Sequence, residues 1–131
     1  MATFISPLRI TTSDSPKAKS HILNLNNYPN WHYRTYAVLK KRYKEAVRSQ
    51  LSGYRFEGRL KITFTLHRKD RRMGDRANVL AVHEKFFCDA LHEWGCIDDD
   101  NDDYIDSSHY YTGEIDKDNP RVEIEIVELF I

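Results

Sequence analysis

The sequence has 131 residues, of which 40% are hydrophobic, so it is long enough for one domain, 1–131, with a single buried core. No apolar run approaches the roughly 18 residues of a membrane-spanning helix, the start lacks the features of a signal peptide, and two cysteines are too few for a disulfide scaffold. We therefore expect a soluble, cytoplasmic protein with no membrane contact.

The formal net charge is zero, but the charges are unevenly distributed along the chain. Residues 1–76 contain 17 Lys and Arg against 5 Asp and Glu, a balance of +12, and residues 77–131 contain 3 against 15, a balance of −12. A basic surface can hold phosphates while an acidic region holds metal ions. The same distribution would also arise if the halves neutralise each other in an ordinary fold, so charge alone leaves both interpretations open.

The first half of the chain predicts a strand, a loop and a helix. Residues 3–10 are expected to form a strand interrupted at Pro7, and residues 11–19 are rich in Ser, Thr and Pro and indicate a loop. A helix is predicted from Tyr33 to Leu51 because apolar side chains recur there at helical spacing, and Gly53 is a plausible stop.

Two groups of residues in this half have more than one interpretation. The helix lysines form either a basic surface for the DNA backbone or a solvated face: Lys40, Lys41 and Lys44. The aromatic residues before and at the start of the helix could stack on unpaired bases, although such residues are more often part of a core or a dimer contact: Tyr28, Trp31 and Tyr33.

Three later segments are expected to form strands. Residues 59–67 alternate strictly between apolar and polar side chains, which predicts a strand with one buried face. Residues 121–131 alternate in the same way until the phase changes at Val127, where we expect a bulge or the end of pairing. Residues 104–115 are predicted to form a third strand. If the first two are neighbours, Glu123 and Glu125 suit Arg59 and Lys61 as cross-strand partners.

A central helix is predicted from Asn78, as its N-cap, to Trp94, with Gly95 as its stop. Its apolar residues form a broad stripe, which includes His83 and predicts that this histidine is a buried, hydrogen-bonded core residue. The opposite side carries a narrow polar line of Asn78, Lys85 and Asp89. Lys85 and Asp89 form either part of a site or a simple i,i+4 surface ion pair.

Carboxylates precede and follow this helix, and together they predict a site for a hard divalent cation. Asp75 lies just before the helix, and Asp99 and Asp100 lie in the acidic segment just after it. If folding brings the two segments together, their oxygens could bind Mg²⁺, and Lys85 could balance the carboxylates or orient a phosphate. A calcium loop is not expected, because Asp103 stands where such a loop needs glycine.

These pieces, taken in order, resemble the RusA family of phage-type Holliday-junction resolvases. The matching residues are Asp75 and Asn78, Lys85 with Asp89-Ala90-Leu91, and Gly95 with Asp99 and Asp100. The resemblance covers most of the chain. It implies an α+β fold, with a small mixed or antiparallel sheet packed against two main helices, and a homodimer.

The resemblance also implies an activity, namely Mg²⁺-dependent resolution of Holliday junctions and other branched DNA in recombination and repair, by paired phosphodiester hydrolysis, with Mn²⁺ as a possible substitute. Asp75, Asp99 and Asp100 would bind the metal and Lys85 would assist catalysis, in a bacterial or phage-infected cell. The family's second motif Asp has no counterpart, because its place falls on Ala77 or Ala81 depending on the alignment.

The expected DNA-binding residues are Lys69, Arg71, Arg72, Arg76 and Asn78, with Lys40, Lys41 and Lys44 on the first helix. The alternative hypothesis is a non-catalytic module of the same fold that binds DNA junctions or another protein. The two hypotheses differ in metal-dependent cleavage, which only the enzyme performs.

Overall fold

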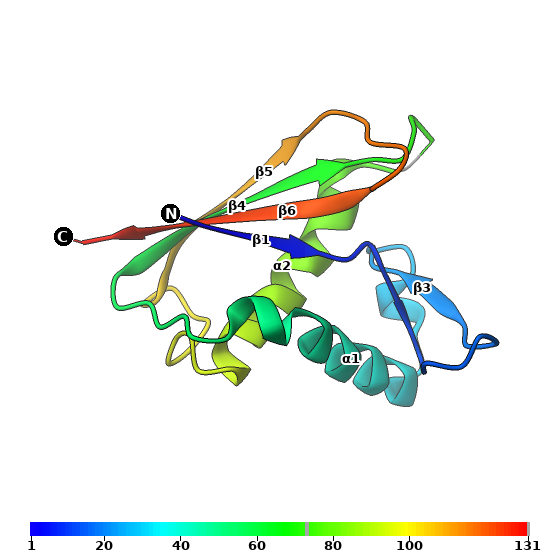
Figure 1. The fold of residues 1–131 in the computed structure, drawn as a ribbon, viewed down its shortest axis with the longest axis horizontal. Helices are drawn as coiled ribbons and strands as arrows, with labels where there is room; N and C mark the ends of the chain where they lie inside the picture. Colours follow the sequence, from blue (N-terminus) through cyan, green and yellow to red (C-terminus); the bar gives the residue numbers. More distant parts are fainter. Residues whose placement is uncertain (73, 131) are drawn as a thin grey trace.

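The computed structural model describes residues 1–72 and 74–130 as a small α+β domain with two main helices and a four-stranded sheet (Figure 1). In chain order its elements are β1 (Ala2–Ser6), β2 (Arg9–Thr11), β3 (Ser20–Ile22), the 3-10 helix η1 (Tyr28–Asn30), α1 (Tyr33–Leu51), β4 (Arg59–His67), α2 (Arg76–Glu93), β5 (Ile105–Thr112) and β6 (Arg121–Leu129). The predicted first strand is therefore two strands, β1 and β2, separated at Pro7 and Leu8.

The main sheet has the order β1-β6-β4-β5, in which β4 and β5 run parallel and the other neighbours run antiparallel. The expected mixed sheet is thus confirmed. The parallel pair matters for the site, because β5 begins beside Leu60 at the start of β4 and ends beside Leu66 near the end of β4. Strands β2 and β3 form a separate two-stranded sheet.

The alternation of β4 and β6 places their apolar side chains on the face that the helices cover. The residues that are at most 1% exposed on this face are Leu60, Ile62, Phe64 and Leu66 of β4 and Val122, Ile124 and Ile126 of β6. In Figure 1 both α1 and α2 lie on the same side of the sheet, so one face is core and the other carries the polar residues of the alternation.

The register of β6 corrects two expectations. Glu125 lies opposite Thr63 and Glu123 opposite Thr65, so the predicted cross-strand pairs with Lys61 and Arg59 are wrong. Pairing with β4 continues without a bulge to the end of β6, whereas pairing with β1 stops at Ile126, where β1 begins. At Val127 the pairing of β6 with β1 has therefore ended, whereas its pairing with β4 continues.

Helix α1 has the predicted bounds, and Gly53 just beyond its end has a φ of +87°, as a helix stop requires. The N-cap of helix α2 is Asp75, three residues before the predicted Asn78, and the helix ends before Gly95, whose φ is +76°. Asn78 lies within the first turn instead, where its backbone carbonyl accepts a hydrogen bond from the Leu25 amide at 2.8 Å.

The centre of the molecule contains a short buried chain of polar contacts. His83 is fully buried on α2, its Nδ1 lies 2.6 Å from Ser6 Oγ on β1, and Ser6 Oγ lies 2.5 Å from the hydroxyl of Tyr43 on α1. This confirms the prediction that His83 is a hydrogen-bonded core residue. These polar contacts connect β1, α1 and α2 within the hydrophobic core.

The two helices run side by side in the same direction, and charged residues connect them. Lys40 Nζ lies 2.8 Å from Asp89 Oδ2, and four residues further along both helices Lys44 Nζ lies 3.8 Å from Glu93 Oε2. Asp89 therefore pairs with α1, and no Lys85–Asp89 ion pair is found among the residues described. Among the residues that the structure describes, no helix is long and apolar enough to span a membrane.

Candidate functional site

The predicted metal ligands lie at opposite ends of α2. Asp75 occupies the N-cap position at the N-terminal end, and Asp99 and Asp100 lie in the loop beyond the C-terminal end. A helix of 18 residues is about 27 Å long, so one chain cannot bring Asp75 and Asp100 to a common cation. The prediction that folding brings these carboxylates together within the chain is therefore wrong. The cause is the parallel strand β5, which must start beside the beginning of β4 and so keeps the acidic loop at that end.

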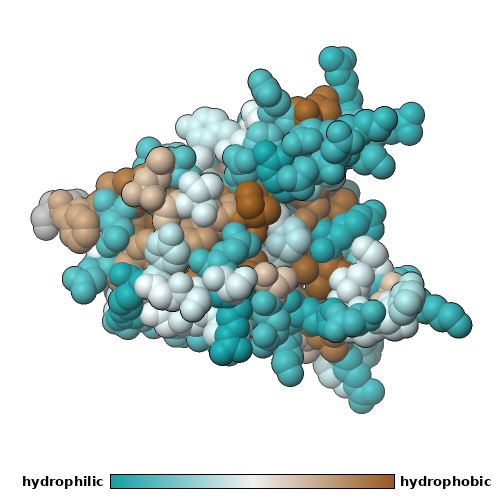
Figure 2. All heavy atoms as spheres, viewed as in Figure 1, coloured by the Kyte–Doolittle hydropathy of each residue, from teal (hydrophilic) through white to brown (hydrophobic). Residues whose placement is uncertain are grey.

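The Asp75 end of α2 is a basic hollow. It has a volume of about 440 Å³ and is lined by Arg68, Arg71, Gly74, Asp75, Thr112, Gly113 and Ile115. Figure 2 shows hydrophilic side chains projecting at the upper right, where Figure 1 places the turn between β4 and α2. Lys69, Arg71, Arg72 and Arg76 are all exposed in or beside this turn. The hollow thus combines several cationic side chains with the N-terminal end of a long helix, and both favour a phosphate.

Asp75 is free to bind a ligand within this basic surrounding. It occupies the N-cap position, yet its side chain makes no capping hydrogen bond and is exposed. Two guanidinium groups beside it contact residues that line the hollow. Arg68 Nη2 donates to the Gly74 carbonyl at 3.0 Å, and Arg76 Nη1 lies 3.4 Å from Thr112 Oγ1. A carboxylate that has no side-chain partner among the described residues, next to cations that can hold a phosphate, is a suitable ligand for a phosphate-bound metal ion.

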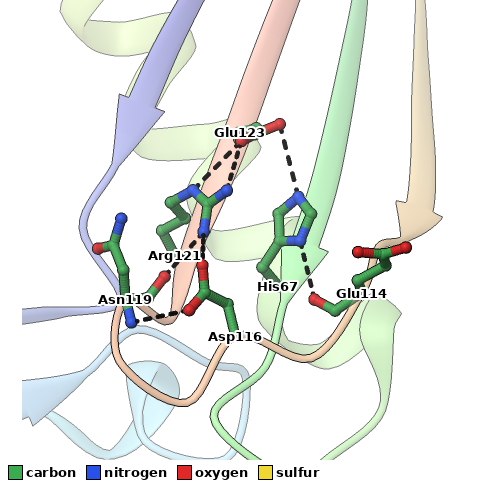
Figure 3. Close-up of polar contacts among 6 residues, drawn as sticks. All are labelled: His67, Glu114, Asp116, Asn119, Arg121 and Glu123. Carbon is green, nitrogen blue, oxygen red and sulfur yellow. Dashed lines mark hydrogen bonds and ion pairs between the residues drawn. The ribbon is translucent and has the colours of Figure 1, made fainter.

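The far wall of the hollow is fixed by His67 (Figure 3). His67 Nδ1 donates to the Glu114 carbonyl at 2.9 Å, and Nε2 faces Glu123 Oε2 at 3.5 Å. Gly113 packs so closely on the imidazole that an added Cβ would lie 2.4 Å from His67 Cε1. Only glycine fits at this position without a shift of the wall.

Arg121 of β6 holds the loop that follows Gly113. It donates from Nη2 and Nε to Glu123 Oε1 at 2.7 and 3.2 Å, and from Nη1 to Asp116 Oδ2 at 2.8 Å and the Asn119 carbonyl at 2.9 Å (Figure 3). These hydrogen bonds lower the pKa of the Glu123 and Asp116 carboxyls. The 113–120 loop is consequently tied to both β4 and β6.

The opposite end of α2 carries a cluster of carboxyl groups from Asp89, Asp99 and Asp100. Partial burial raises the pKa of the Asp100 carboxyl, and the adjacent Asp89 and Asp99 raise it further. Lys40 is the cation of this cluster, and its hydrogen bond with Asp89 raises its own pKa. Asp99 accepts hydrogen bonds from the Asp100 amide at 2.7 Å and from Asn101 Nδ2 at 3.1 Å. The carboxyls repel one another, and a divalent cation would relieve that repulsion.

The remaining predicted residues fall between these ends. Lys85 is exposed in the middle of α2, close enough to Tyr36 for its charge to affect the hydroxyl, whose pKa burial raises. Lys40 and Lys44 are engaged with carboxylates of α2, whereas Lys41 is exposed. Within residues 1–72 and 74–130, no three His, Cys, Asp or Glu side chains are arranged to hold a metal ion.

Sequence reasoning missed the parts of the hollow that come from a distant segment. Thr112, Gly113 and Ile115 reach Asp75 only because β5 pairs with β4 in parallel, so no local pattern indicated them. Arg68 directly precedes the basic turn and could have been included from its position alone. Neither a protein-family model nor a curated protein sequence matches this chain.

Proposed function

We propose that the protein is a Mg²⁺-dependent endonuclease of the RusA type that resolves Holliday junctions and related branched DNA by paired phosphodiester hydrolysis. The observation that carries the proposal is the placement of Asp89, Asp99 and Asp100 together beside Lys40, where partial burial and the neighbouring carboxyls raise the pKa of Asp100. Because no three side chains of the described residues form a complete metal site, the proposal requires further ligands from a second chain. Carboxylate oxygens are the ligands that Mg²⁺ and Mn²⁺ accept in nucleases. The activity belongs in the cytoplasm of a bacterial or phage-infected cell.

The basic hollow supports the same proposal from the other end of α2. Its Arg68 and Arg71 side chains, with the exposed Lys69, Arg72 and Arg76 around it, suit the phosphates of a DNA strand. Asp75 is the carboxylate inside this surface. DNA is therefore held where the first half of the chain is basic, and the acidic cluster remains available for a cation.

A second copy of the chain would unite the two ends. In a two-fold dimer that sets the Asp75 end of one chain against the Asp99–Asp100 loop of its partner, symmetry creates the reciprocal contact. The length of α2 is then no obstacle, since each site takes ligands from both chains. Two equivalent sites per dimer suit a four-way junction, in which two strands of opposite arms must be cut.

Each residue has a defined task in such a site. Asp75 from one chain and Asp99 and Asp100 from the other hold the cation, Arg68 and Arg71 hold the phosphate, and Lys85 offsets the negative charge of the reacting group. A bound Mg²⁺ supplies an activated water and stabilises the charge that develops on the phosphate oxygens. The second motif carboxylate is absent, since Ala77 and Ala81 occupy its alternative places, and Asp89 is the nearest substitute on the acidic side.

Mixing two inactive variants tests both the activity and the shared site. Asp75→Asn alone and Asp100→Asn alone should each bind junctions and fail to cut them. In a heterodimer of the two, one site contains both substitutions and the other contains none, so the mixture should nick branched DNA with Mg²⁺. An inactive mixture, measured beside an active wild-type dimer, would contradict the shared site. Full cleavage by both single variants would remove these residues from the site altogether.

The second candidate is a non-catalytic module of the same fold that binds DNA junctions or another protein. The alanines at positions 77 and 81 favour it, because they remove a carboxylate from the N-terminal turn of α2. It predicts that the wild-type protein binds branched DNA with equal affinity in Mg²⁺, Mn²⁺ or chelator and never cuts it. Metal-dependent nicking excludes this candidate.

A further inference from the structure

The structure separates the aromatic residues that precede and begin α1 into two groups. Tyr28 and Trp31 are half-buried and pack against Phe86 of α2, with ring centroids 6.2 and 6.5 Å away. Tyr33 has no such role, because its side chain is 68% exposed and its ring makes no contact with the core cluster. Of the three residues that could stack on a base, the fold therefore uses two and leaves one at the surface.

Tyr33 is nevertheless held in a fixed position. The His32 side chain caps α1 by accepting a hydrogen bond from the Arg34 amide at 3.2 Å, which sets the imidazole beside the tyrosine. The two ring centroids are 4.4 Å apart with an interplanar angle of 33°. At the other end of the side chain, Arg34 Nε donates to the Tyr33 hydroxyl at 3.2 Å. A large exposed ring that is already ordered loses little conformational entropy when a flat ligand binds it.

The surroundings of Tyr33 are suited to nucleic acid. Arg34 adds a guanidinium beside the ring, and the first turn of α1 contributes the partial positive charge of a helix N-terminus and contains no acidic residue. Along the chain Tyr33 lies between Trp31, which packs against Phe86 of α2, and Lys40, which pairs with Asp89 of the acidic cluster.

We propose that Tyr33, held by His32 and Arg34, is a stacking platform for an unpaired base of DNA, with the Arg34 guanidinium next to the phosphate of that nucleotide. This inference rests on the proposed function for the class of ligand, DNA, and adds that the protein contacts an unpaired base of it. Aromatic side chains bind any base through its flat face, so the platform recognises unpaired nucleotides rather than a sequence. A branch point, where pairing is strained or lost, supplies such bases.

The test compares the affinities of the full-length protein for a four-way junction with unpaired thymines at its centre and for a fully paired duplex, by fluorescence anisotropy. Tyr33→Ala should weaken binding to the unpaired-base junction about 5- to 100-fold and change duplex binding less than about twofold. Tyr33→Phe keeps the flat ring and should bind like wild type. The matched control is Tyr111→Ala, which removes a 55% exposed tyrosine from β5 and should leave both affinities unchanged.

The possible results distinguish the stacking role of Tyr33 from the proposed nuclease activity. Equal affinities of wild type and Tyr33→Ala for the unpaired-base junction overturn the platform, even if the protein cuts DNA. An equal loss on both DNAs also overturns it, because it shows a general contact and no preference for unpaired bases. A selective loss in a protein that never cuts supports the platform and refutes the nuclease. Failure of the wild type to bind either DNA overturns both the platform and the nuclease.

Discussion

Lowering the pH from 7 to 5 should remove about 2 kcal/mol of folding stability through a single side chain, His83. The imidazole is fully buried on α2, its Nε2 has no hydrogen-bond partner among residues 1–72 and 74–130, and its Nδ1 lies 2.6 Å from Ser6 Oγ. Burial lowers the pKa of His83 from 6.5 to about 3. In the unfolded chain the same imidazole is hydrated and takes up a proton near its ordinary pKa of about 6.5.

The sign and size follow from the difference in bound protons. Between pH 6.5 and 3 the unfolded chain holds a proton on His83 that the folded chain excludes, so stability falls as the pH falls. The slope approaches about 1.3 kcal/mol per pH unit at pH 5, and the total loss reaches about 5 kcal/mol below pH 3. The raised pKa of Asp100 acts with the opposite sign, and the lowered pKa values of Asp116 and Glu123 act at lower pH, so the histidine contribution is isolated by comparing wild type with a variant that lacks the His83 imidazole.

Urea denaturation followed by tryptophan fluorescence at pH 7, 6 and 5 measures the effect. His83→Asn keeps a polar atom near the Nδ1 position and cannot titrate, so its free energy of unfolding should lose about 2 kcal/mol less than wild type over this range. His92→Asn changes an exposed histidine in the last turn of the same helix and should follow the wild-type curve. Parallel curves for wild type and His83→Asn would refute the reasoning, because the buried imidazole would then bind protons as the unfolded one does.

Three further predictions concern the hollow and the helix beside it. Gly113→Ala should lower the free energy of unfolding by about 1–3 kcal/mol, because the added Cβ would meet the His67 ring. Gly74→Ala should lower it by less than about 1 kcal/mol, because no atom lies within 4 Å of the added Cβ. Equal losses for the two variants in urea denaturation would contradict the close packing at Gly113. Lys85→Ala should lower the single-turnover cleavage rate about 100-fold at an unchanged melting temperature, and a lowered melting temperature with normal specific activity would show a purely structural role. Arg71→Ala should reduce the slope of log affinity against log salt by about 1, while Lys61→Ala, near the end of β4 that is away from the hollow, should not. A flat wild-type salt response would exclude the basic surface.

The periodicity of the sequence was enough to predict the main elements. The alternation of residues 59–67 fixed β4 and its buried face, and the helical spacing from Tyr33 to Leu51 gave both ends of α1. Gly53 and Gly95 marked helix ends because only glycine adopts their positive φ without strain. His83 was identified as a core residue by its place in the apolar stripe. These properties depend on neighbours a few residues away, which the sequence displays directly.

The composition of the candidate site was decided by contacts between distant segments. The sequence placed Asp75 before a helix and Asp100 after it, but the straight course of α2 and the parallel start of β5 keep them apart. The same arrangement brought Gly113 to the Asp75 hollow and set Asp89 against Lys40 rather than Lys85. Patterns along a chain specify which face of an element is buried, whereas strand direction and helix pairing, which the pattern does not encode, determine which distant charges meet.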